Sequence, residues 1–366
     1  MQPAAQRRFG VLLAGGGGTR LWPASVRSRP KQFLALGHRE DESLIAGAAR
    51  RLQEVCGAGN LLVVTAEAQV GQVSAALPEL PAGDILAEPA GRNTAAAIGL
   101  AAVHAAHRDP DALLGAVPAD QDITDEDGFS ALADEAFRLA SERQAIVLLG
   151  VVPTRPETGF GYLELGAFIE GDAREVARFV EKPDEPTARR YASSGSHLWN
   201  AGMFFAPARL LLDEIARHLP ETGAGLSAIA DALREGGEAA AADKAREVYP
   251  TLPSMSIDHG VMEKTTGAIA LPADIGWNDV GSWSALAEVR PADDAGNVLE
   301  GRALAIDAKR NIIVGDGDHA VAVVGADDLV VVQSGRGILV IPRERAQDVR
   351  RVVAELKARN LDEFLD

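Results

Sequence analysis

Cysteine is almost absent from this 366-residue chain, which contains a single one, Cys56. One cysteine excludes an internal disulfide and a zinc site built from cysteine ligands. Aromatic residues make up only 5% of the chain, and no segment approaches the roughly 20 uncharged apolar residues of a membrane span. The N-terminus also lacks the apolar core of a secretory signal, because glycines interrupt the apolar run after Ala14. These absences predict a cytoplasmic protein with no membrane partner.

Acidic side chains are missing from the first 39 residues, although the whole chain carries a formal charge of −17. That stretch contains seven basic residues: Arg7, Arg8, Arg20, Arg27, Arg29, Lys31 and Arg39. The acidic balance of the whole chain disfavours a nucleic-acid partner, because nonspecific binding to DNA or RNA needs a basic face. Locally concentrated positive charge on an acidic protein favours a small phosphorylated ligand instead.

An apolar run over residues 11–14 leads into four consecutive glycines: Gly15, Gly16, Gly17 and Gly18. Such a run exposes backbone N–H groups that can surround a phosphate without side-chain clash. It is not a P-loop, because no lysine follows before Lys31, and it lacks the third glycine of a dinucleotide fingerprint, where Arg20 stands. A plain strand-to-helix turn is the alternative, but such a turn needs only one or two glycines.

Apolar runs alternate with helical patterns from residue 9 to about 287. Strands are predicted at 11–14, 61–65, 113–117, 146–151, 176–180 and 203–205, and helices at 44–55, 94–107, 208–218 and 239–248. Thr94 is a candidate N-cap of the second helix. Alternation of this kind predicts an α/β fold with a mostly parallel, doubly wound sheet that binds ligands at the carboxyl ends of its strands.

The composition shifts after about residue 290. Residues 302–342 consist of Val, Ile and Ala runs broken by Asp-Gly, Gly-Asp and Gly-Ala turns, which predicts a small β domain. An amphipathic helix is expected over about 345–359. The predicted organisation is therefore a ligand-binding domain over 1–287 and a β-rich domain with a closing helix over 288–366.

Two motifs carry a family resemblance. They are Gly15-Gly16-x-Gly18-Thr19-Arg20-Leu21-Trp22-Pro23-x-Ser25 and Pro30-Lys31-Gln32-Phe33. Together they resemble the signature of sugar-nucleotide pyrophosphorylases, and in particular of bacterial mannose-1-phosphate guanylyltransferases. The resemblance implies a Rossmann-like nucleotidyltransferase domain with a mixed sheet, Mg²⁺ as cofactor, and conversion of GTP and mannose 1-phosphate into GDP-mannose and pyrophosphate. It also implies a homodimer.

The resemblance also implies roles for the residues of the glycine motif. Those from Gly15 to Thr19 would surround the nucleotide phosphates, while Arg20 and Lys31 would neutralise the triphosphate and the departing pyrophosphate. The sugar phosphate would attack the α-phosphorus in line, so the protein has mainly to position two anions and stabilise the leaving group.

Two aspartates are the candidate metal ligands. Asp120 follows the apolar run Leu113–Val117, and Asp279 lies between two tryptophans in the segment 277–283. Either alone is more typical of a turn or helix cap. In the family context they match a metal-binding pair, with Asp120 also on the nucleotide side, and Mg²⁺ accepts one or two carboxylates together with phosphate oxygens and water.

The sugar side of the predicted site comes from three segments. Glu181-Lys182 ends an apolar run, and in isolation it would be a surface ion pair. The resemblance makes Lys182 a catalytic residue and the ligand of the sugar phosphate, with Glu181, Asn200 and the Gly161 backbone on the mannose hydroxyls. A neutral hexose needs such partners, because its recognition depends on satisfied hydroxyl groups.

The segment 88–94 resembles the family's base-side loop, and the resemblance makes Glu88 and Asn93 the candidate nucleotide ligands. Guanine presents N–H donors, so a loop that reads it needs an acceptor such as a backbone carbonyl or the Glu88 carboxylate. The alternative for Asn93 and Thr94 is simple helix capping. The segment 256–264 also resembles a family segment, in which Asp258 is interpreted as structural.

All four tryptophans lie in the matched motifs: Trp22, Trp199, Trp277 and Trp283. We expect them to line one pocket, with burial in the general core as the alternative. The sequence departs from the family pattern at Val26, where arginine is common, and at Gln121, where histidine is usual. The rival functions are another hexose-1-phosphate nucleotidyltransferase and a catalytically silent regulator that binds sugar nucleotides.

Overall fold

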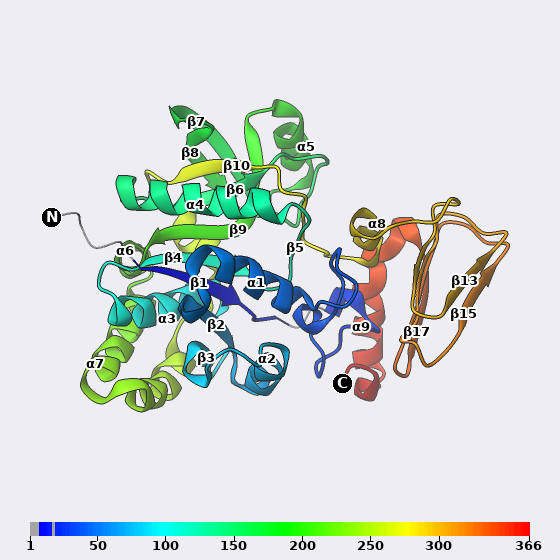
Figure 1. Ribbon diagram of the computed structural model, residues 1–366, viewed down its shortest axis with the longest axis horizontal. Coiled ribbons are helices and arrows are strands. Elements are labelled where there is room, and N and C mark those ends of the chain that lie inside the picture. Colours follow the sequence, from blue (N-terminus) through cyan, green and yellow to red (C-terminus); the bar gives the residue numbers. More distant parts are fainter. Residues whose placement is uncertain (1–6, 17–18) are drawn as a thin grey trace. The chain divides into compact units, whose positions relative to one another are not determined.

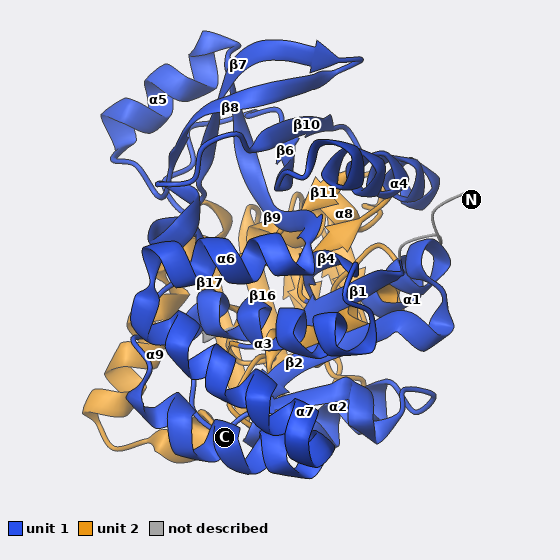
Figure 2. Ribbon diagram, turned by 90° about the vertical axis from the view of Figure 1, so that its left-hand side faces the viewer, with its two compact units in different colours: residues 1–15, 48–119, 125–275 blue, residues 16–47, 120–124, 276–366 orange. Residues whose placement is uncertain are grey.

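The computed structural model describes residues 7–16 and 19–366, which divide into two compact units (Figure 2). Unit 1 takes in residues up to 15, 48–119 and 125–275, and unit 2 takes in 16–47, 120–124 and 276–366. Unit 2 therefore combines the C-terminal region with two segments that come much earlier in the chain. The domain boundary placed at 287/288 stays a prediction.

A nine-stranded sheet forms the centre of unit 1, in the order β3-β2-β1-β4-β9-β6-β10-β8-β7 (Figure 1). Its strands are β1 (Arg8–Leu13), β2 (Leu61–Ala66), β3 (Ile85–Glu88), β4 (Leu113–Pro118), β6 (Val147–Val151), β7 (Tyr162–Glu170), β8 (Ala173–Val180), β9 (His197–Pro207) and β10 (Ile269–Ala273). Each of the six predicted strands overlaps one of these elements.

The sheet is mixed, and most of its strands share one direction. The pairs β3-β2, β2-β1, β1-β4 and β6-β10 are parallel. β9 lies antiparallel to β4, β6 and β7, and β8 lies antiparallel to β10 and β7. Seven strands therefore point one way, and only β8 and β9 oppose them. The prediction of a mixed, mostly parallel sheet is confirmed.

Helices cover both faces of this sheet. On one face α3 (Asn93–Arg108), α6 (Ala208–His218) and α7 (Pro220–Val248) share a continuous apolar core with the strands. On the other face lie α1 (Leu44–Cys56) and α4 (Glu126–Arg143). Gly10 of β1 pairs with Gly115 of β4. A Cβ atom at Gly10 would lie 3.1 Å from Leu52 of α1, and a Cβ atom at Gly115 would lie 2.8 Å from Phe137 of α4. Two short helices complete the unit, α2 (Val70–Ala76) and α5 (Glu185–Ser194).

Helix α7 is longer than predicted, and it bends at one residue. Gly237 interrupts it with φ 72° and ψ −166°, a conformation that strongly favours glycine. The predicted helix at 239–248 corresponds to the part after this kink.

The β-rich part of unit 2 is built from stacked coils. β12 (Val298–Glu300), β14 (Ile312–Val314) and β16 (Leu329–Ser334) pair in parallel, as do β13 (Ala303–Ile306) and β15 (Val321–Val324). Only β17 (Gly337–Pro342) forms an antiparallel pair there, with β16. The predicted small β domain is confirmed. Most of its turns lead from one coil to the next, parallel coil, and fewer of them form hairpins.

Four further strands and helices belong to unit 2. The short strands β5 (Asp122–Ile123) and β11 (Trp277–Asn278) pair antiparallel, and α8 (Leu286–Val289) follows the second of them. The closing helix α9 spans Val349–Ala358, after 3-10 turns over Arg343–Asp348 that replace the first turn of the predicted helix. Across the described ranges, no helix has the length and apolar character needed to cross a membrane.

Candidate active site

The glycine loop begins directly after the central strand β1. Gly15 and Gly16 are exposed, and a Cβ atom at either position would contact nothing within 4 Å. Gly16 has φ 120°, which disfavours any side chain. The predicted phosphate ligands Gly17 and Gly18 lie outside the described residues. The chain resumes in a 3-10 turn, Thr19–Leu21, where Arg20 is exposed. The described part of the loop thus leaves room for a ligand close to its backbone.

Lys31 connects the two predicted metal aspartates. Its side chain is 9% exposed, and its Nζ donates a hydrogen bond to the Asp120 carboxylate at 3.0 Å. The same ammonium group also donates to the backbone carbonyl of Asp279. Three residues that were predicted from separate motifs, spread over about 250 positions of sequence, therefore meet within unit 2.

The loop that carries Asp279 has a defined shape. β11 and β5 place Asn278 opposite Asp122, and the Asn278 side chain accepts a hydrogen bond from the Val280 N–H at 2.8 Å. The Asp279 carboxylate accepts one from the Gly281 N–H at 3.3 Å. Gln121, where the family usually has histidine, accepts a hydrogen bond from the Trp277 indole at 2.9 Å. The Gln121 side chain therefore links the segment that follows Asp120 to the segment that precedes Asp279.

The donor set suits a hard divalent cation that is shared with a nucleotide. Asp120 and Asp279 provide carboxylate oxygens, and the Asp120 side chain is 43% exposed. The described residues contain no cluster of three or more acidic, histidine or cysteine side chains that could hold a metal. Two carboxylates leave the other coordination positions of Mg²⁺ to phosphate oxygens and water, which is its usual arrangement in nucleotide sites. The residues present therefore fit Mg²⁺.

The predicted sugar residues meet at one end of the sheet in unit 1. Tyr162 at the start of β7 pairs with the last residue of β8 and with Trp199 of β9, so the residues adjacent to these positions converge. The Asn200 N–H donates to the Gly161 carbonyl at 2.8 Å. A Cβ atom at Gly161 would lie 2.6 Å from a Glu181 carboxylate oxygen. Only glycine fits at this position without displacing Glu181.

Glu181 and Lys182 form an ion pair at the same place. The Glu181 side chain is 7% exposed, whereas that of Lys182 is 58% exposed, so the lysine reaches solvent and the carboxylate does not. Lys182 has φ 44°, an uncommon backbone conformation for a residue with a side chain. Backbone strain of this kind is concentrated at functional sites.

Asp258 belongs to this cluster, although its sequence context led to its interpretation as structural. Its carboxylate accepts a hydrogen bond from the Asn200 side-chain amide at 3.0 Å. Burial, followed by the negative charge of Glu181, raises the pKa of Asp258 to about 6. The one signal in the sequence was the resemblance of the segment 256–264 to a family segment, which assigned no contact to this carboxylate.

The predicted base-side residues lie in unit 1, where β3 leads into α3. Glu88 ends β3 and is 8% exposed, and its burial raises the pKa of the carboxyl group to about 7 while a hydrogen bond with Tyr249 opposes the shift. Asn93 begins α3 with φ 67°, and its side chain accepts a hydrogen bond from the Thr94 N–H at 2.9 Å.

The expectation that Thr94 caps α3 is wrong. The N-cap residue is Arg92, which makes no side-chain capping bond. The Thr94 hydroxyl instead accepts a hydrogen bond from the Ile257 N–H at 2.9 Å, 163 positions away in sequence. A tertiary contact therefore replaces the local bond that a threonine at a helix start usually makes.

Comparison with known proteins identifies the family. The family model Nucleotidyl transferase matches residues 9–296, and MannoseP isomerase/GMP-like beta-helix domain matches residues 301–356. The chain is 38% identical to the mannose-1-phosphate guanylyltransferase of Escherichia coli K12, over 97% of this chain and 74% of the relative. This chain belongs to the mannose-1-phosphate guanylyltransferase family.

Two further proteins resemble this member of the mannose-1-phosphate guanylyltransferase family over most of its length. The xanthan biosynthesis protein XanB of Xanthomonas campestris is 39% identical, over 95% of this chain and 73% of that protein. A crystal structure described as mannose-1-phosphate geranyltransferase, from Thermus thermophilus, has a TM-score of 0.85 at 33% identity and covers 96% of this chain and 100% of that one. The mixed α/β unit and the stacked β coils are therefore both family features.

Two of the four tryptophans of this family member fill an apolar core and do not line a pocket. Trp22 is 7% exposed, and Trp283 is fully buried in the apolar core of unit 2. The Trp283 indole donates a hydrogen bond to the Trp22 carbonyl at 3.1 Å. Trp199, in unit 1, instead packs edge-on against Phe160, with 5.3 Å between the ring centroids. The expected shared pocket is wrong for Trp22 and Trp283, because both are needed to fill a core.

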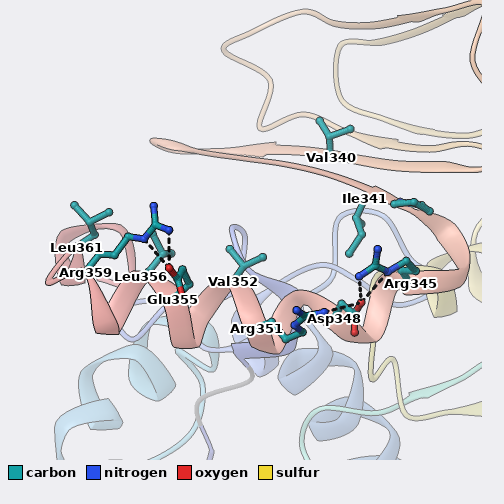
Figure 3. Close-up of a pocket in the computed structure, with 11 residues that line it drawn as sticks. Val340, Ile341, Arg345, Asp348, Arg351, Val352, Glu355, Leu356, Arg359 and Leu361 are labelled. Carbon is teal, nitrogen blue, oxygen red and sulfur yellow. Dashed lines mark hydrogen bonds and ion pairs between the residues drawn. The ribbon is translucent and has the colours of Figure 1, made fainter.

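A separate groove of about 600 Å³ lies along β17 and α9 of unit 2 (Figure 3). Its charged side chains pair along the helical segment, Arg345 with Asp348 and Arg359 with Glu355, both at 2.6 Å. Among the described residues, none of those predicted to bind nucleotide, sugar or metal lines this groove. The candidate ligands of this guanylyltransferase family member therefore belong to other segments: the glycine loop, Lys31 and the sugar-side cluster.

Proposed function

We propose that this chain transfers the guanylyl group of GTP to α-D-mannose 1-phosphate, forming GDP-mannose and pyrophosphate, with Mg²⁺ as cofactor. The relatives named mannose-1-phosphate guanylyltransferase support this proposal. The structural observation that carries it is the contact of the Lys31 ammonium with both the Asp120 carboxylate and the Asp279 backbone. A lysine ammonium that holds one aspartate by its carboxylate and a second by its backbone carbonyl fits a site where a metal and a polyphosphate bind together.

The reaction brings two anions together, so the protein has to position them and offset their repulsion. An oxygen of mannose 1-phosphate attacks the α-phosphorus of GTP, and the bond from that phosphorus to the bridging oxygen of the β-phosphate breaks. The electron pair leaves with pyrophosphate. Arg20 and Lys31 stabilise the charge that accumulates on the leaving group. When bound to Asp120 and Asp279, Mg²⁺ supplies further neutralisation of the phosphate oxygens.

The remaining residues of the proposed site recognise the two substrates. The backbone from Gly15 to Thr19 surrounds the nucleotide phosphates, and Glu88 and Asn93 bind on the base side. In unit 1, Lys182 binds the sugar phosphate. Glu181, Asn200 and the Gly161 backbone bind the mannose hydroxyls, a role supported by their convergence at the ends of β7, β8 and β9.

The test is pyrophosphate release with Mg²⁺, crossing GTP, ATP, UTP and dTTP against mannose 1-phosphate and glucose 1-phosphate. We expect release only from GTP with mannose 1-phosphate. Another productive pair would retain the mechanism and change the substrate. Tight binding of GDP-mannose by folded protein with no release in any combination would favour the silent regulator.

The metal role has its own test. Asp279→Asn is expected to lower turnover at least 100-fold without changing the thermal stability of the protein, because a neutral amide binds Mg²⁺ poorly. Asp274→Asn, an exposed aspartate five positions earlier, is the matched control. Turnover of Asp279→Asn close to that of the control would remove Asp279 from the metal site.

We also propose that the protein is a cytoplasmic homodimer, which accords with the family resemblance and with substrates that are phosphorylated metabolites. Light scattering coupled to gel filtration measures the mass directly. A mass equal to one chain at micromolar concentration would contradict the dimer.

A further inference from the structure

One segment of unit 1, Met255–Glu263, contacts both the base-side and the sugar-side residues of the proposed site. Its middle, Asp258–Met262, forms a single π-helical turn, in which the Glu263 N–H bonds to the Asp258 carbonyl at 3.0 Å. Such turns are rare and occur frequently at functional sites. The sequence alone predicted no function for any residue in this segment.

The start of the segment is attached to the base side. Met255 exchanges backbone hydrogen bonds with the start of α3: its N–H donates to the Arg92 carbonyl, and its carbonyl accepts from the Ala95 N–H, both at 3.2 Å. The Ile257 N–H donates to the Thr94 hydroxyl at 2.9 Å. These three bonds fix the place at which the π turn begins.

The two ends of the π turn hold the sugar side. The Asp258 carboxylate accepts a hydrogen bond from the Asn200 side-chain amide at 3.0 Å. The Glu263 carboxylate accepts one from the Glu181 backbone N–H at 3.1 Å. Each acidic residue thus contacts one of the residues that the proposed function places on mannose.

The bond from Asp258 sets which way the Asn200 amide faces. The Asn200 carbonyl oxygen accepts a hydrogen bond from the Gly202 N–H at 3.0 Å, while its NH₂ group donates to Asp258. With both ends held, the carboxamide cannot exchange its donor and acceptor atoms. A polar group with a fixed orientation binds a hydroxyl without first losing rotational freedom.

A second carboxylate beside Glu181 has an electrostatic cost. Burial and the neighbouring charge of Glu181 both raise the pKa of Asp258, whereas Lys182 and His259 lower it. A residue that served only to fill space would not need this charge. The hydrogen bond that the Asp258 carboxylate accepts from Asn200 offsets this electrostatic cost.

We infer that Asp258 and Glu263 are positioning residues for the sugar phosphate substrate, which hold Asn200 and Glu181 in their binding conformation through one π-helical turn. The inference rests on the proposed function of that site, since it assigns the two carboxylates to its mannose half. It predicts that their loss affects the sugar phosphate more than the nucleotide.

The experiment compares four variants of the full chain by steady-state kinetics: Asp258→Ala, Asp258→Asn, Glu263→Ala and Glu214→Gln. Asp258→Ala is expected to raise KM for mannose 1-phosphate at least tenfold and KM for GTP less than twofold. Asp258→Asn keeps an oxygen that can accept from Asn200, so it should restore KM to within about threefold of the parent. Glu263→Ala should also raise KM for mannose 1-phosphate more than KM for GTP, but by a smaller factor.

Glu214→Gln is the matched control, because Glu214 is also a buried carboxylate of unit 1, and its partners Thr265, Arg217 and His218 are not among the proposed substrate ligands. It should leave both KM values unchanged. Glu263 is exposed, so its variant serves if Asp258→Ala does not fold. Equal increases in both KM values, or no rescue by asparagine, would overturn the inference.

Direct binding separates this inference from the proposed function. Calorimetric titration of GDP-mannose and of mannose 1-phosphate needs no turnover. A parent protein that binds them without reacting would contradict the proposed function, and weaker binding by Asp258→Ala would still support the positioning role. A parent that neither reacts nor binds would contradict both.

Discussion

Glu88 lies at the end of a parallel strand with most of its side chain out of water. Removing a carboxylate from water disfavours its charged form, so burial raises the pKa from 4.5 to about 7. The unfolded chain binds fewer protons than the folded one between these values. The stability of the folded state therefore falls as the pH rises from about 4.5 to about 7.

Glu88→Gln should remove this contribution, because glutamine is close to glutamate in size and does not titrate. Relative to the parent, the variant should gain stability across that pH range, by up to about 3 kcal/mol above pH 7. Urea unfolding of both proteins at pH 4.5, 6 and 8 measures the difference. A difference that stays constant with pH would show that Glu88 does not titrate there.

Gly161 provides a second prediction for a single residue. Gly161→Ala would place a Cβ atom 2.6 Å from the Glu181 carboxylate and 3.1 Å from the Phe179 ring, so Glu181 has to move. We expect KM for mannose 1-phosphate to rise at least tenfold with the GTP value little changed. Gly159→Ala is the control from the same loop, since its Cβ would meet only the end of the flexible Glu157 side chain. Equal kinetics for the two variants would contradict the role of Gly161.

Among the structural elements, the β coils of unit 2 depend on two buried asparagines. Asn311 is fully buried, and its side chain bonds the Ala326 carbonyl, the Leu329 N–H and the Asn297 side chain at 2.9–3.1 Å. Asn297 in turn bonds the Ala308 carbonyl at 3.0 Å. These amides replace backbone bonds at the corners where one coil leads to the next, so they fix the stacking of β14 on β12 and β16.

Asn311→Ala should cost about 3 kcal/mol of stability, because it leaves several backbone and side-chain groups without partners in a buried place. Chemical unfolding measures this loss, and faster hydrogen exchange at the Leu329 amide would locate it in the coils. Asp318→Ala, at an exposed position in the same coils, should change stability by less than about 0.5 kcal/mol. A similar effect of both substitutions would contradict the corner role of Asn311.

At the scale of the whole molecule, the proposed ligands divide between the two units. Lys31, Asp120 and Asp279 belong to unit 2, and the sugar-side cluster with Lys182 belongs to unit 1. Lys31→Ala should therefore raise KM for GTP and lower kcat, because it removes a cation from the polyphosphate. Lys182→Ala should raise KM for mannose 1-phosphate more than KM for GTP.

We expect each main effect to be at least tenfold, which corresponds to about 1.4 kcal/mol of binding free energy. Both KM values are measured from initial rates, with one substrate varied while the other is kept at a saturating concentration. Lys309→Ala, an exposed lysine of the β coils outside the site, controls for the loss of one positive charge. Equal effects of Lys182→Ala on both substrates would remove it from the sugar phosphate.

Much of this organisation could be predicted from the sequence, because its signals are local. Apolar runs of four to six residues identified buried strands such as β2 and β4. Apolar residues at helical spacing identified α1, since side chains that repeat about every 3.6 residues face one core. The residues of the glycine loop and of the proposed ligands were predicted from short motifs. A family resemblance supplied their roles, which no pattern of hydrophobicity contains.

The contacts between segments that are distant in sequence became visible only in the folded chain. Folding brought Lys31 to Asp120 and Asp279, attached Thr94 to Ile257 instead of to its own helix, and placed Asp258 on Asn200. A hydrogen bond between such residues depends on the path of the chain between them, whereas an apolar period depends only on neighbours. Local sequence therefore specifies the elements and the candidate ligands of this protein, and the fold selects which polar groups become partners.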